Sequence, residues 1–258
     1  MLSRAVLNLL MGCAISTLVA CGDGSTGSAD GGDGVIGTGV YSGVAQKGPL
    51  LLGSTVTVQE IDAKLSPTGK QYSYQINSDL GTFSATSTFT SKYLGINATG
   101  YYFDEVTNGI STSTVTLNGV SDLNTDTTLN VNLLTTLAYQ RTKNLVNTLG
   151  LSVAAARSQA EQEVLAAFGI RNGATYGSFG SFDISKRGDG DGILTALSSV
   201  FVYGNSAGAL SSLIANFQSD IADNGVIDTA ATQAALTSAA TQVNPTVIAY
   251  NLSQKYGT

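Results

Sequence analysis

The segment 129-LNVNLLTTLA-138 decides the fold, because the spacing of its apolar residues changes within it. Up to Leu133 the apolar side chains alternate with polar ones, which is typical of a strand with one buried face. From Leu133 onward they recur every three or four residues, through Leu137 to Leu145, which is typical of an amphipathic helix. We therefore predict strands before this segment and helices after it.

The alternating pattern recurs in short runs across residues 40–132. Residues 55–59 (TVTVQ) and 71–77 (QYSYQIN) are clear examples, and both are rich in the valine, threonine and tyrosine that favour strands. Turn signals separate the runs, among them Asn108-Gly109 and Asn118-Gly119. Seven or so short strands at this spacing predict an antiparallel β-sandwich.

Residues 133–258 are predicted to form an all-α helical domain. Gly150 is expected to stop the first helix, Ser152 to cap the second, and Asn244-Pro245 to open the last. An alanine-rich helix is expected from Asp228 to Val243. The expected fold class is therefore α+β, an N-terminal antiparallel β-sandwich followed by a C-terminal helical domain, with a short linker that packs the sheet against the first helix.

The first 21 residues have the features of a lipoprotein signal. Arg4 provides a positive charge, an apolar run extends to Thr17, and Leu18-Val19-Ala20-Cys21 ends it. This ending resembles the lipobox of bacterial lipoproteins, whose cysteine receives a diacylglycerol before the signal is cut and the new amine is acylated. The resemblance implies that residues 1–20 are a signal peptide and that Cys21 is the lipid-attachment site.

Two other interpretations of this region stay open. The motif Leu10-Met11-Gly12-Cys13 is also similar to a lipobox, although only Ala5 to Leu9 would precede it as an apolar region. Alternatively, Cys21 is an ordinary cysteine that follows an ordinary signal. Once Cys13 is removed, Cys21 is the only thiol, so no intrachain disulfide is expected.

Residues 21–39 are rich in glycine, serine and aspartate and are predicted to be a flexible tether. Gly22 follows the cysteine in place of the aspartate that retains some lipoproteins at the inner membrane, which favours sorting to the outer membrane. The expected location is therefore the bacterial outer membrane, with the protein anchored through acylated Cys21 and facing the periplasm or the cell surface.

Composition excludes several classes of function. The 258 residues include no histidine, so Ser-His-Asp triads, Cys-His dyads and histidine-ligated metal sites are ruled out. The net charge is −6 and the longest basic run is Lys186-Arg187, so we do not expect nucleic acid as a partner. The sequence predicts no catalytic residue, no cofactor and no bound metal.

Four motifs in the predicted sandwich carry a second resemblance. In chain order they are Ser42-Gly43-Val44, 53-GSTVTV-58, 78-SDLGTFS-84 and Ala98-Thr99-Gly100-Tyr101. This order resembles the carboxypeptidase regulatory-like, or transthyretin-like, β-sandwich of bacterial surface proteins. The resemblance implies a scaffold and no particular activity. Glu60 departs from the pattern because it takes the apolar face of its strand, so a bulge or the end of the strand is expected there.

Asp189 and Asp191 lie in 183-DISKRGDGDGI-193, which is similar to the middle of an EF-hand or dockerin calcium loop. In that alignment Arg187 occupies the first ligand position and Ser198 the twelfth, where the loop requires carboxylates. These residues favour the alternative, a glycine-rich turn whose aspartates cap a helix that begins near residue 193.

The segment 220-DIADNGVID-228 is also similar to a calcium loop and is also better interpreted as a turn. Asp220 could be a first ligand, but Ala222 and Ala231 fill positions that need oxygen atoms. We expect a turn followed by a helix that Asp228 caps.

Asp104-Glu105 are adjacent acids that follow the aromatic run Tyr101-Tyr102-Phe103. Neighbouring residues on a strand point to opposite faces, so these two carboxylates are not expected to act on one bond. We expect a solvated turn, with stacking of the aromatic run on sugar rings as an alternative.

Lys47, Glu60 and Asn118 raise one covalent possibility through the same family resemblance. Some transthyretin-like surface domains join a first-strand lysine to a last-strand asparagine in an isopeptide bond, with a buried acid as catalyst. Glu60 would suit the role of the acid. However, Lys47 at a Gly-Pro turn and Asn118 at an Asn-Gly turn are both expected in solvent.

The function expected from the sequence is that of a lipid-anchored cell-envelope protein acting as a non-catalytic binding or structural module. One alternative is a glycan-acting envelope enzyme that uses carboxylates, which would need two of them about 5–9.5 Å apart in a cleft. Another is an assembly subunit that adds a strand to a neighbour. The candidate partners are the membrane and another envelope protein or a glycan.

Overall fold

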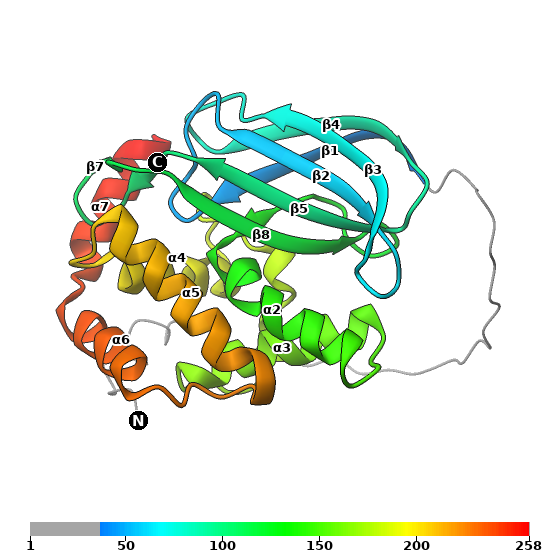
Figure 1. The fold of residues 1–258 in the computed structure, drawn as a ribbon. Coiled ribbons are helices and arrows are strands. Elements are labelled where there is room, and N and C mark those ends of the chain that lie inside the picture. Colours follow the sequence, from blue (N-terminus) through cyan, green and yellow to red (C-terminus); the bar gives the residue numbers. More distant parts are fainter. Residues whose placement is uncertain (1–36, 258) are drawn as a thin grey trace.

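The computed structural model describes residues 37–257, with strands in the N-terminal part and helices in the C-terminal part (Figure 1). The predicted α+β order is therefore confirmed. The strands are β1 (Gly37–Gln46), β2 (Thr55–Ile61), β3 (Pro67–Gln75), β4 (Thr82–Phe89), β5 (Tyr93–Gly100), β6 (Phe103–Asp104), β7 (Gly109–Ile110), β8 (Val115–Asp122) and β9 (Val131–Asn132). The α-helices are α2 (Leu133–Asn147), α3 (Val153–Ala167), α4 (Asp189–Val202), α5 (Ala207–Asn224), α6 (Ala230–Gln242) and α7 (Pro245–Tyr256), and two 3-10 helices are η1 (Gly173–Tyr176) and η2 (Phe179–Ser181).

The longer strands form two sheets, one in the order β4-β1-β9 and one in the order β3-β2-β5-β8, and β6 and β7 form a small hairpin. The second sheet is antiparallel throughout, as predicted. The first is mixed, because β1 pairs antiparallel with β4 but parallel with β9, where Ala45 lies opposite Val131. The prediction of a wholly antiparallel arrangement is wrong for this pair, since the chain passes through the entire second sheet before it returns beside β1.

The irregularity expected at Glu60 is confirmed, although the extra residues lie on the partner strand. The pairing of β2 with β3 shifts register between Gln59 and Ile61: Gln59 lies opposite Gln71 and Ile61 opposite Pro67, so Glu60 alone faces three residues of β3. Val56 and Val58 on the same strand are fully buried, and Glu60 is buried beside them.

The start of α2 agrees with the change of period in the sequence. The helix begins at Leu133, and Asn132 caps it by accepting a hydrogen bond from the Thr135 main-chain N–H at 2.9 Å. At the other boundary, β1 begins at Gly37, three residues inside the predicted tether. The predicted signal peptide, Cys21 and the rest of the tether lie outside the described residues.

The Asn118-Gly119 pair forms no turn, contrary to expectation, and lies inside β8. A Cβ atom at Gly119 would approach the Thr135 side chain to 3.3 Å, so the glycine permits α2 to lie close to the strand. The Asn118 main-chain N–H donates to Thr136 Oγ1 at 2.9 Å, which joins the first turn of α2 to β8.

Two helix starts differ from the predictions. Helix α4 begins at Asp189 rather than near residue 193, and Gly190 in its first turn leaves room for the Phe182 ring. In helix α6 the N-cap position is taken by Thr229 and not by Asp228, and the Thr229 side chain makes no capping hydrogen bond to the helix. The reason is Asp220 on α5, which accepts hydrogen bonds from the Thr229 main-chain N–H at 2.9 Å and from its hydroxyl at 3.0 Å.

Other helix signals are confirmed. Ser152 caps α3 by accepting from the Ala155 N–H at 3.3 Å, and Asn244 caps α7, which has Pro245 at its first position. Helix α2 ends at Asn147, shortly before the predicted stop at Gly150, which has φ +71°.

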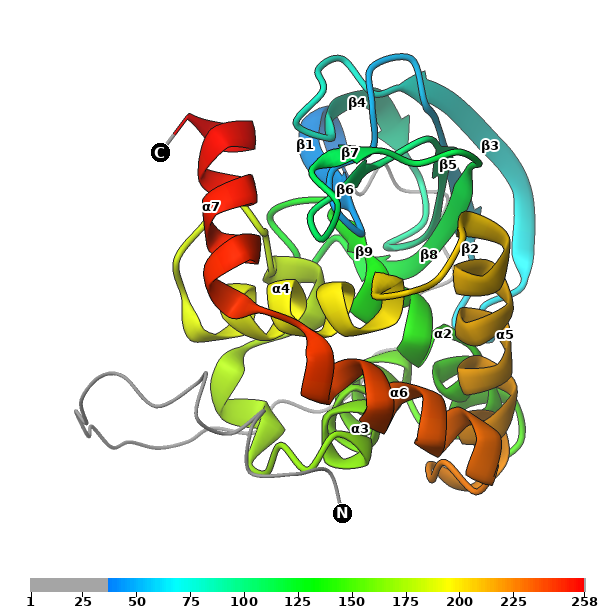
Figure 2. The ribbon, with the colours of Figure 1, turned by 90° about the vertical axis from the view of Figure 1, so that its left-hand side faces the viewer.

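Strands and helices share one hydrophobic core. The buried side chains of both parts form a single cluster that includes Phe83 of β4, Leu137 of α2 and Phe217 of α5. Figure 1 shows α2 and α5 beneath the sheets, and Figure 2 shows α4 and α6 beneath the strands and α7 beside them. Within residues 37–257 no single helix is long and apolar enough to span a membrane; α4 and α5 meet that test only together, across a bend of 116°.

Candidate functional site

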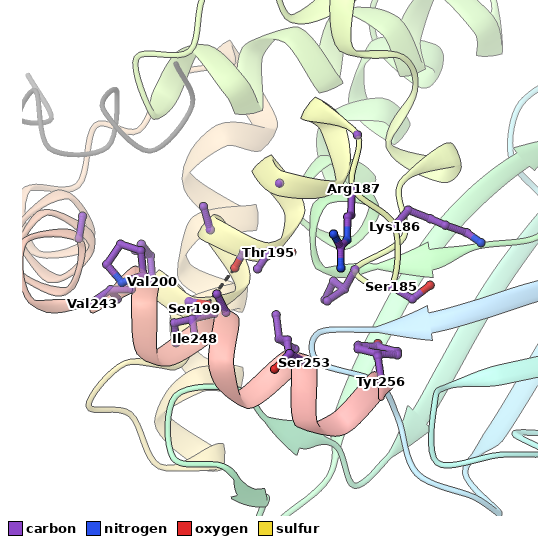
Figure 3. A pocket seen from close by; sticks show the side chains of 18 of the residues that line it. Ser185, Lys186, Arg187, Thr195, Ser199, Val200, Val243, Ile248, Ser253 and Tyr256 are labelled. Carbon is purple, nitrogen blue, oxygen red and sulfur yellow. Dashed lines mark hydrogen bonds between the residues drawn. The ribbon is translucent and has the colours of Figure 1, made fainter. Parts of the chain in front are cut away.

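A cavity of about 570 Å³ lies between α4 on one side and α6 and α7 on the other (Figure 3). The loop 184–188, which leads into α4, closes one end. We call this cavity the α4–α7 pocket. Its volume falls within the range of small-molecule sites in proteins, roughly 300–1,000 Å³.

Most of the pocket wall is apolar. Helix α4 contributes Ala196 and Val200, helix α7 contributes Ile248 and Leu252, and Val243 lies in the connection between α6 and α7. Val200, Ile248 and Leu252 are buried. In Figure 3, Val200, Val243 and Ile248 gather at one end of the pocket, which makes that end suitable for a hydrocarbon group.

The opposite end of the pocket is positively charged. Among the described residues, Lys186 and Arg187 are the only charged ones in its lining. Figure 3 shows Arg187 extending toward α7, whereas Lys186 extends away from it along the loop. Both are exposed, and neither side chain forms a hydrogen bond or ion pair with another described residue. Two neighbouring cations without a carboxylate partner favour an anionic group at this end.

Two aspartates fix the loop that carries these cations. Asp191 accepts hydrogen bonds from the main-chain N–H groups of Asp183 and Gly188, both at 2.8 Å. Asp183 accepts from the Ser185 main chain at 2.9 Å and from its hydroxyl at 2.7 Å. Both carboxylates are therefore occupied in holding the loop.

Calcium binding finds no support in this geometry. Asp191 caps the loop and α4, Asp189 is exposed, and Ser198 is buried within α4. In the part of the chain that the structure describes, no three His, Cys, Asp or Glu side chains are placed to share a metal ion. At the second aspartate segment, Asp220 holds Thr229 and Asp228 accepts from Asn224 at 2.8 Å.

Helix α7, one wall of the pocket, is attached to the strand region by a few specific contacts. Asn251 Nδ2 donates to the main-chain oxygen of Glu105 at 2.9 Å, and the Lys255 ammonium group lies 5.2 Å from the centre of the Phe103 ring. Gln46 Nε2 lies 3.4 Å from the Tyr256 hydroxyl. Burial, together with the charges of Asp183 and Glu105, raises the pKa of Tyr256, so its hydroxyl keeps its proton at neutral pH.

Lys47 and Glu105 form a buried ion pair, which corrects both predictions of a solvated turn. Lys47 Nζ lies 3.0 and 3.1 Å from the two carboxylate oxygens, and the side chains are 0% and 1% exposed. The ammonium group also lies 4.7 Å from the centre of the Tyr102 ring. No alternation in the sequence marks this burial, because Lys47 lies in the turn after β1 and its neighbours Ala45 and Gln46 are both buried as well.

Lys47, Glu60 and Asn118 do not come together around one acid. Glu60 accepts hydrogen bonds from Thr90, Ser91 and Tyr72, whereas Lys47 is paired with Glu105. Asn118 accepts from Asn97 Nδ2 at 2.9 Å. Each of the three has its own partners, so the isopeptide hypothesis has no geometry to support it.

The aromatic run 101–103 offers one exposed ring. Tyr101 is 48% exposed, but Tyr102 and Phe103 are buried in the core. The three rings therefore cannot all stack on sugar rings. Asp104 stabilises the local turn, because its carboxylate accepts a hydrogen bond from the Val106 N–H at 2.9 Å.

A second cavity, of about 340 Å³, has two carboxylates in its lining, those of Asp126 and Glu161, together with Arg157. Asp126 is paired with Arg157 at 3.0 Å and also accepts from Ser121 and from the Asp122 N–H, each at 2.9 Å. Burial raises the pKa of Glu161 to about 7, although the Arg157 charge opposes this rise. No local pattern in the sequence marks these two acids as a pair, since one lies on a loop and the other on α3.

The two family resemblances rest on short motifs. The lipobox residues lie outside the described part of the chain, and the four sandwich motifs fall on or beside β1, β2, β4 and β5. No protein-family model, curated protein or solved structure matches the chain.

Proposed function

We propose that this chain is a lipid-anchored protein of the bacterial cell envelope that binds a small apolar ligand in the α4–α7 pocket without catalysing a reaction. The observation that carries the proposal is the pocket itself, about 570 Å³ with mainly apolar walls and a few polar groups at one end. This combination is typical of small-molecule binding sites. An acylated Cys21 and the tether behind it would supply the anchor.

The strand region would serve as the scaffold between anchor and pocket, and we propose that its two sheets form a sandwich of the transthyretin-like kind. In Figure 1, β1 begins on the side of the molecule away from α7 and ends close to it. A tether attached at Gly37 would therefore join the molecule at the end away from the pocket. This arrangement supports a ligand site that is accessible from the surroundings of the membrane.

A fluorescent probe tests the pocket. N-phenyl-1-naphthylamine, a neutral apolar dye, should become brighter with the full chain carrying Cys21→Ser, which avoids detergent. Ala249 on α7 lines the pocket and is exposed, so Ala249→Phe should fill the space and weaken dye binding about tenfold. Ala215→Phe, at an exposed position on α5, is the matched control and should bind as the parent chain does. Equal binding by both variants would place the dye elsewhere and remove the main support for the proposal.

Membrane fractionation tests the anchor. Cys21→Ser should abolish the incorporation of labelled palmitate. In a chain whose residues 1–20 are replaced by an ordinary cleavable secretory signal, the same change should release the protein from membranes washed with high salt, because the tether has no apolar segment of its own. An inhibitor of the lipoprotein signal peptidase should cause the unprocessed form of the parent chain to accumulate. Palmitate incorporation by the Cys21→Ser chain would refute lipid attachment at Cys21.

The cavity lined by Asp126 and Glu161 favours a second candidate function, glycan hydrolysis. A carboxyl group with a pKa of about 7 beside one paired with arginine resembles the acid and the ionised partner of a glycosidase. Incubation with purified peptidoglycan should then release soluble fragments, and Glu161→Gln should abolish the release while Asp189→Asn does not. If the parent chain releases no soluble fragments, glycan hydrolysis is refuted and ligand binding remains the proposed function.

A further inference from the structure

The charge of the α4–α7 pocket is opposite to that of the protein as a whole. The chain has a net charge of −6, yet the charged residues that line the pocket within residues 37–257 are both cations, Lys186 and Arg187. The nearby Asp183 and Asp191 are engaged by N–H and hydroxyl groups of the loop and by Gln46, and neither is paired with these cations. The two cations are therefore available to an anion from outside.

Polar groups that could assist an anion lie at the same end of the pocket. Figure 3 places Ser185 and Tyr256 near Arg187, and Ser253 further along α7. The Tyr256 hydroxyl accepts from Gln46 Nε2 and keeps its own O–H to donate. The hydroxyls of Ser185 and Ser253 already donate to Asp183 and to the Tyr250 main-chain oxygen, so an anion would have to compete for them. The opposite end, at Val200, is mainly apolar, and the Ser199 hydroxyl there donates to the Thr195 main-chain oxygen at 2.9 Å. The polarity of the pocket therefore changes along its length.

We propose that the α4–α7 pocket binds an amphiphile with a single acyl chain and an anionic head group. The head group lies at Lys186 and Arg187, and the acyl chain lies along Val200, Val243 and Ile248. A charged guanidinium binds a carboxylate or a phosphate, and the apolar walls bury the methylene groups. This inference rests on the proposed function and adds the charge and shape of the ligand.

Titration calorimetry with the full chain carrying Cys21→Ser tests the head group. The probes share a twelve-carbon chain: dodecanoate, dodecyl phosphate, monolauroylglycerol and dodecyltrimethylammonium, each below its critical micelle concentration. Dodecanoate and dodecyl phosphate should both bind. The ratio of their dissociation constants shows whether the site prefers a carboxylate or a phosphate. The neutral lipid should bind about tenfold more weakly, and the cationic one should give no measurable heat.

A pair of variants tests the two cations. Lys186→Gln with Arg187→Gln should weaken dodecanoate binding about tenfold and leave the binding of neutral N-phenyl-1-naphthylamine unchanged. The matched control is Lys64→Gln with Arg171→Gln, which removes the same charge from two exposed positions outside this pocket. The control should bind both probes as the parent chain does.

A series of chain lengths tests the apolar end. From octanoate to dodecanoate, each added methylene should tighten binding roughly three- to fourfold, because each removes about the same apolar area from water. Affinity that is independent of chain length would indicate a site for small anions and overturn the proposal.

The two levels of inference fail in different ways. If the neutral dye and monolauroylglycerol bind as tightly as dodecanoate, and removal of the two cations has no effect, the anionic ligand is refuted while the apolar pocket remains. If no probe binds, the dye included, the proposed function fails and the further inference with it.

Discussion

Glu60 and Glu105 are both about 1% exposed, but the molecule surrounds them in opposite ways. Glu60 lies on β2 where its pairing with β3 shifts register, and it accepts hydrogen bonds from Tyr72, Thr90 and Ser91. Glu105, after β6, has one charged partner, Lys47. The comparison shows that burial alone does not decide how an acid contributes to a fold; its partners do.

The pKa values of the two carboxyl groups differ for this reason. Burial acts to raise the pKa of Glu60, but hydrogen bonds from Thr90 and Tyr72 and the charge of Lys70 outweigh it, so the pKa lies below its ordinary value. At Glu105 burial is complete, and it raises the pKa above the ordinary value despite the attraction of Lys47.

The two sites also differ in what they hold in place. The main-chain oxygen of Glu105 accepts the hydrogen bond from Asn251, so this region fixes α7 and with it one wall of the α4–α7 pocket. The Glu60 carboxylate is bonded only to residues of the strand region and its loops. Substitutions near Glu105 should therefore alter ligand binding in the pocket as well as stability. Substitutions near Glu60 should alter only the stability of the fold.

The largest effect is expected from Lys47→Met, which leaves the Glu105 carboxylate buried without a cation. The free energy of unfolding should fall by about 3–5 kcal/mol at pH 7, measured by urea denaturation of the chain carrying Cys21→Ser. Lys64→Met, at an exposed position, is the control and should change it by less than about 0.5 kcal/mol.

A double variant sharpens the same point. Lys47→Met with Glu105→Leu removes both charges, so the stability should return to within about 1 kcal/mol of the parent. If the double variant remains as unstable as Lys47→Met, the loss comes from packing and not from an unpaired charge.

Glu60→Gln should have the next largest effect. The amide retains one oxygen but places an NH2 group against donors such as the N–H groups of Thr90 and Ser91, so at least one buried donor loses its acceptor. A cost of about 2 kcal/mol is expected in the same denaturation experiment. Dye binding in the pocket should not change; a loss of dye binding would contradict the separation of the two regions.

Asn251→Ala should cost about 1 kcal/mol, since it removes one buried hydrogen bond between α7 and the Glu105 main chain. Its effect should be concentrated locally, and amide hydrogen exchange should accelerate in residues 245–256 more than in the strands. Weaker binding of N-phenyl-1-naphthylamine should accompany it. Uniform acceleration across the chain would show that the bond supports the whole fold and not one wall of the pocket.

The smallest effect is expected in the pH dependence of stability, with opposite signs at the two sites. The pKa of Glu60 is lowered, so its contribution is complete above about the ordinary value of 4.5 and is lost as pH falls through the folded-state pKa. The pKa of Glu105 is raised, so the folded chain retains a proton that the unfolded chain has released, and stability declines as pH rises above 4.5. In a plot of the free energy of unfolding against pH, Glu60→Gln should reduce the loss of stability at acid pH. Glu105→Gln should reduce the decline in stability above pH 4.5. Identical profiles for the two variants would refute the contrast.

The sequence by itself determined those features whose causes lie within a few residues. The change of period at Leu133 located the end of the strands and the start of α2, because burial on one face requires a fixed spacing in each structure. Ser152 and Asn244 located two further helix starts, since a cap is a contact between residues three or fewer positions apart. Glu60 marked the place where the pairing of β2 and β3 shifts register, because it put an acid on the apolar face of its own strand.

The tertiary structure decided what depends on residues far apart in the chain. Lys47 was expected in solvent, and its burial follows from Glu105, which lies 58 positions away and reaches it only when β1 and the segment after β6 are in place. The α4–α7 pocket likewise needs α4 and α7 on opposite sides of one space, and Lys186-Arg187 in the sequence was only a short basic run until the loop placed it there. Local patterns record which face of an element is buried, but only packing decides which distant residue it is buried against.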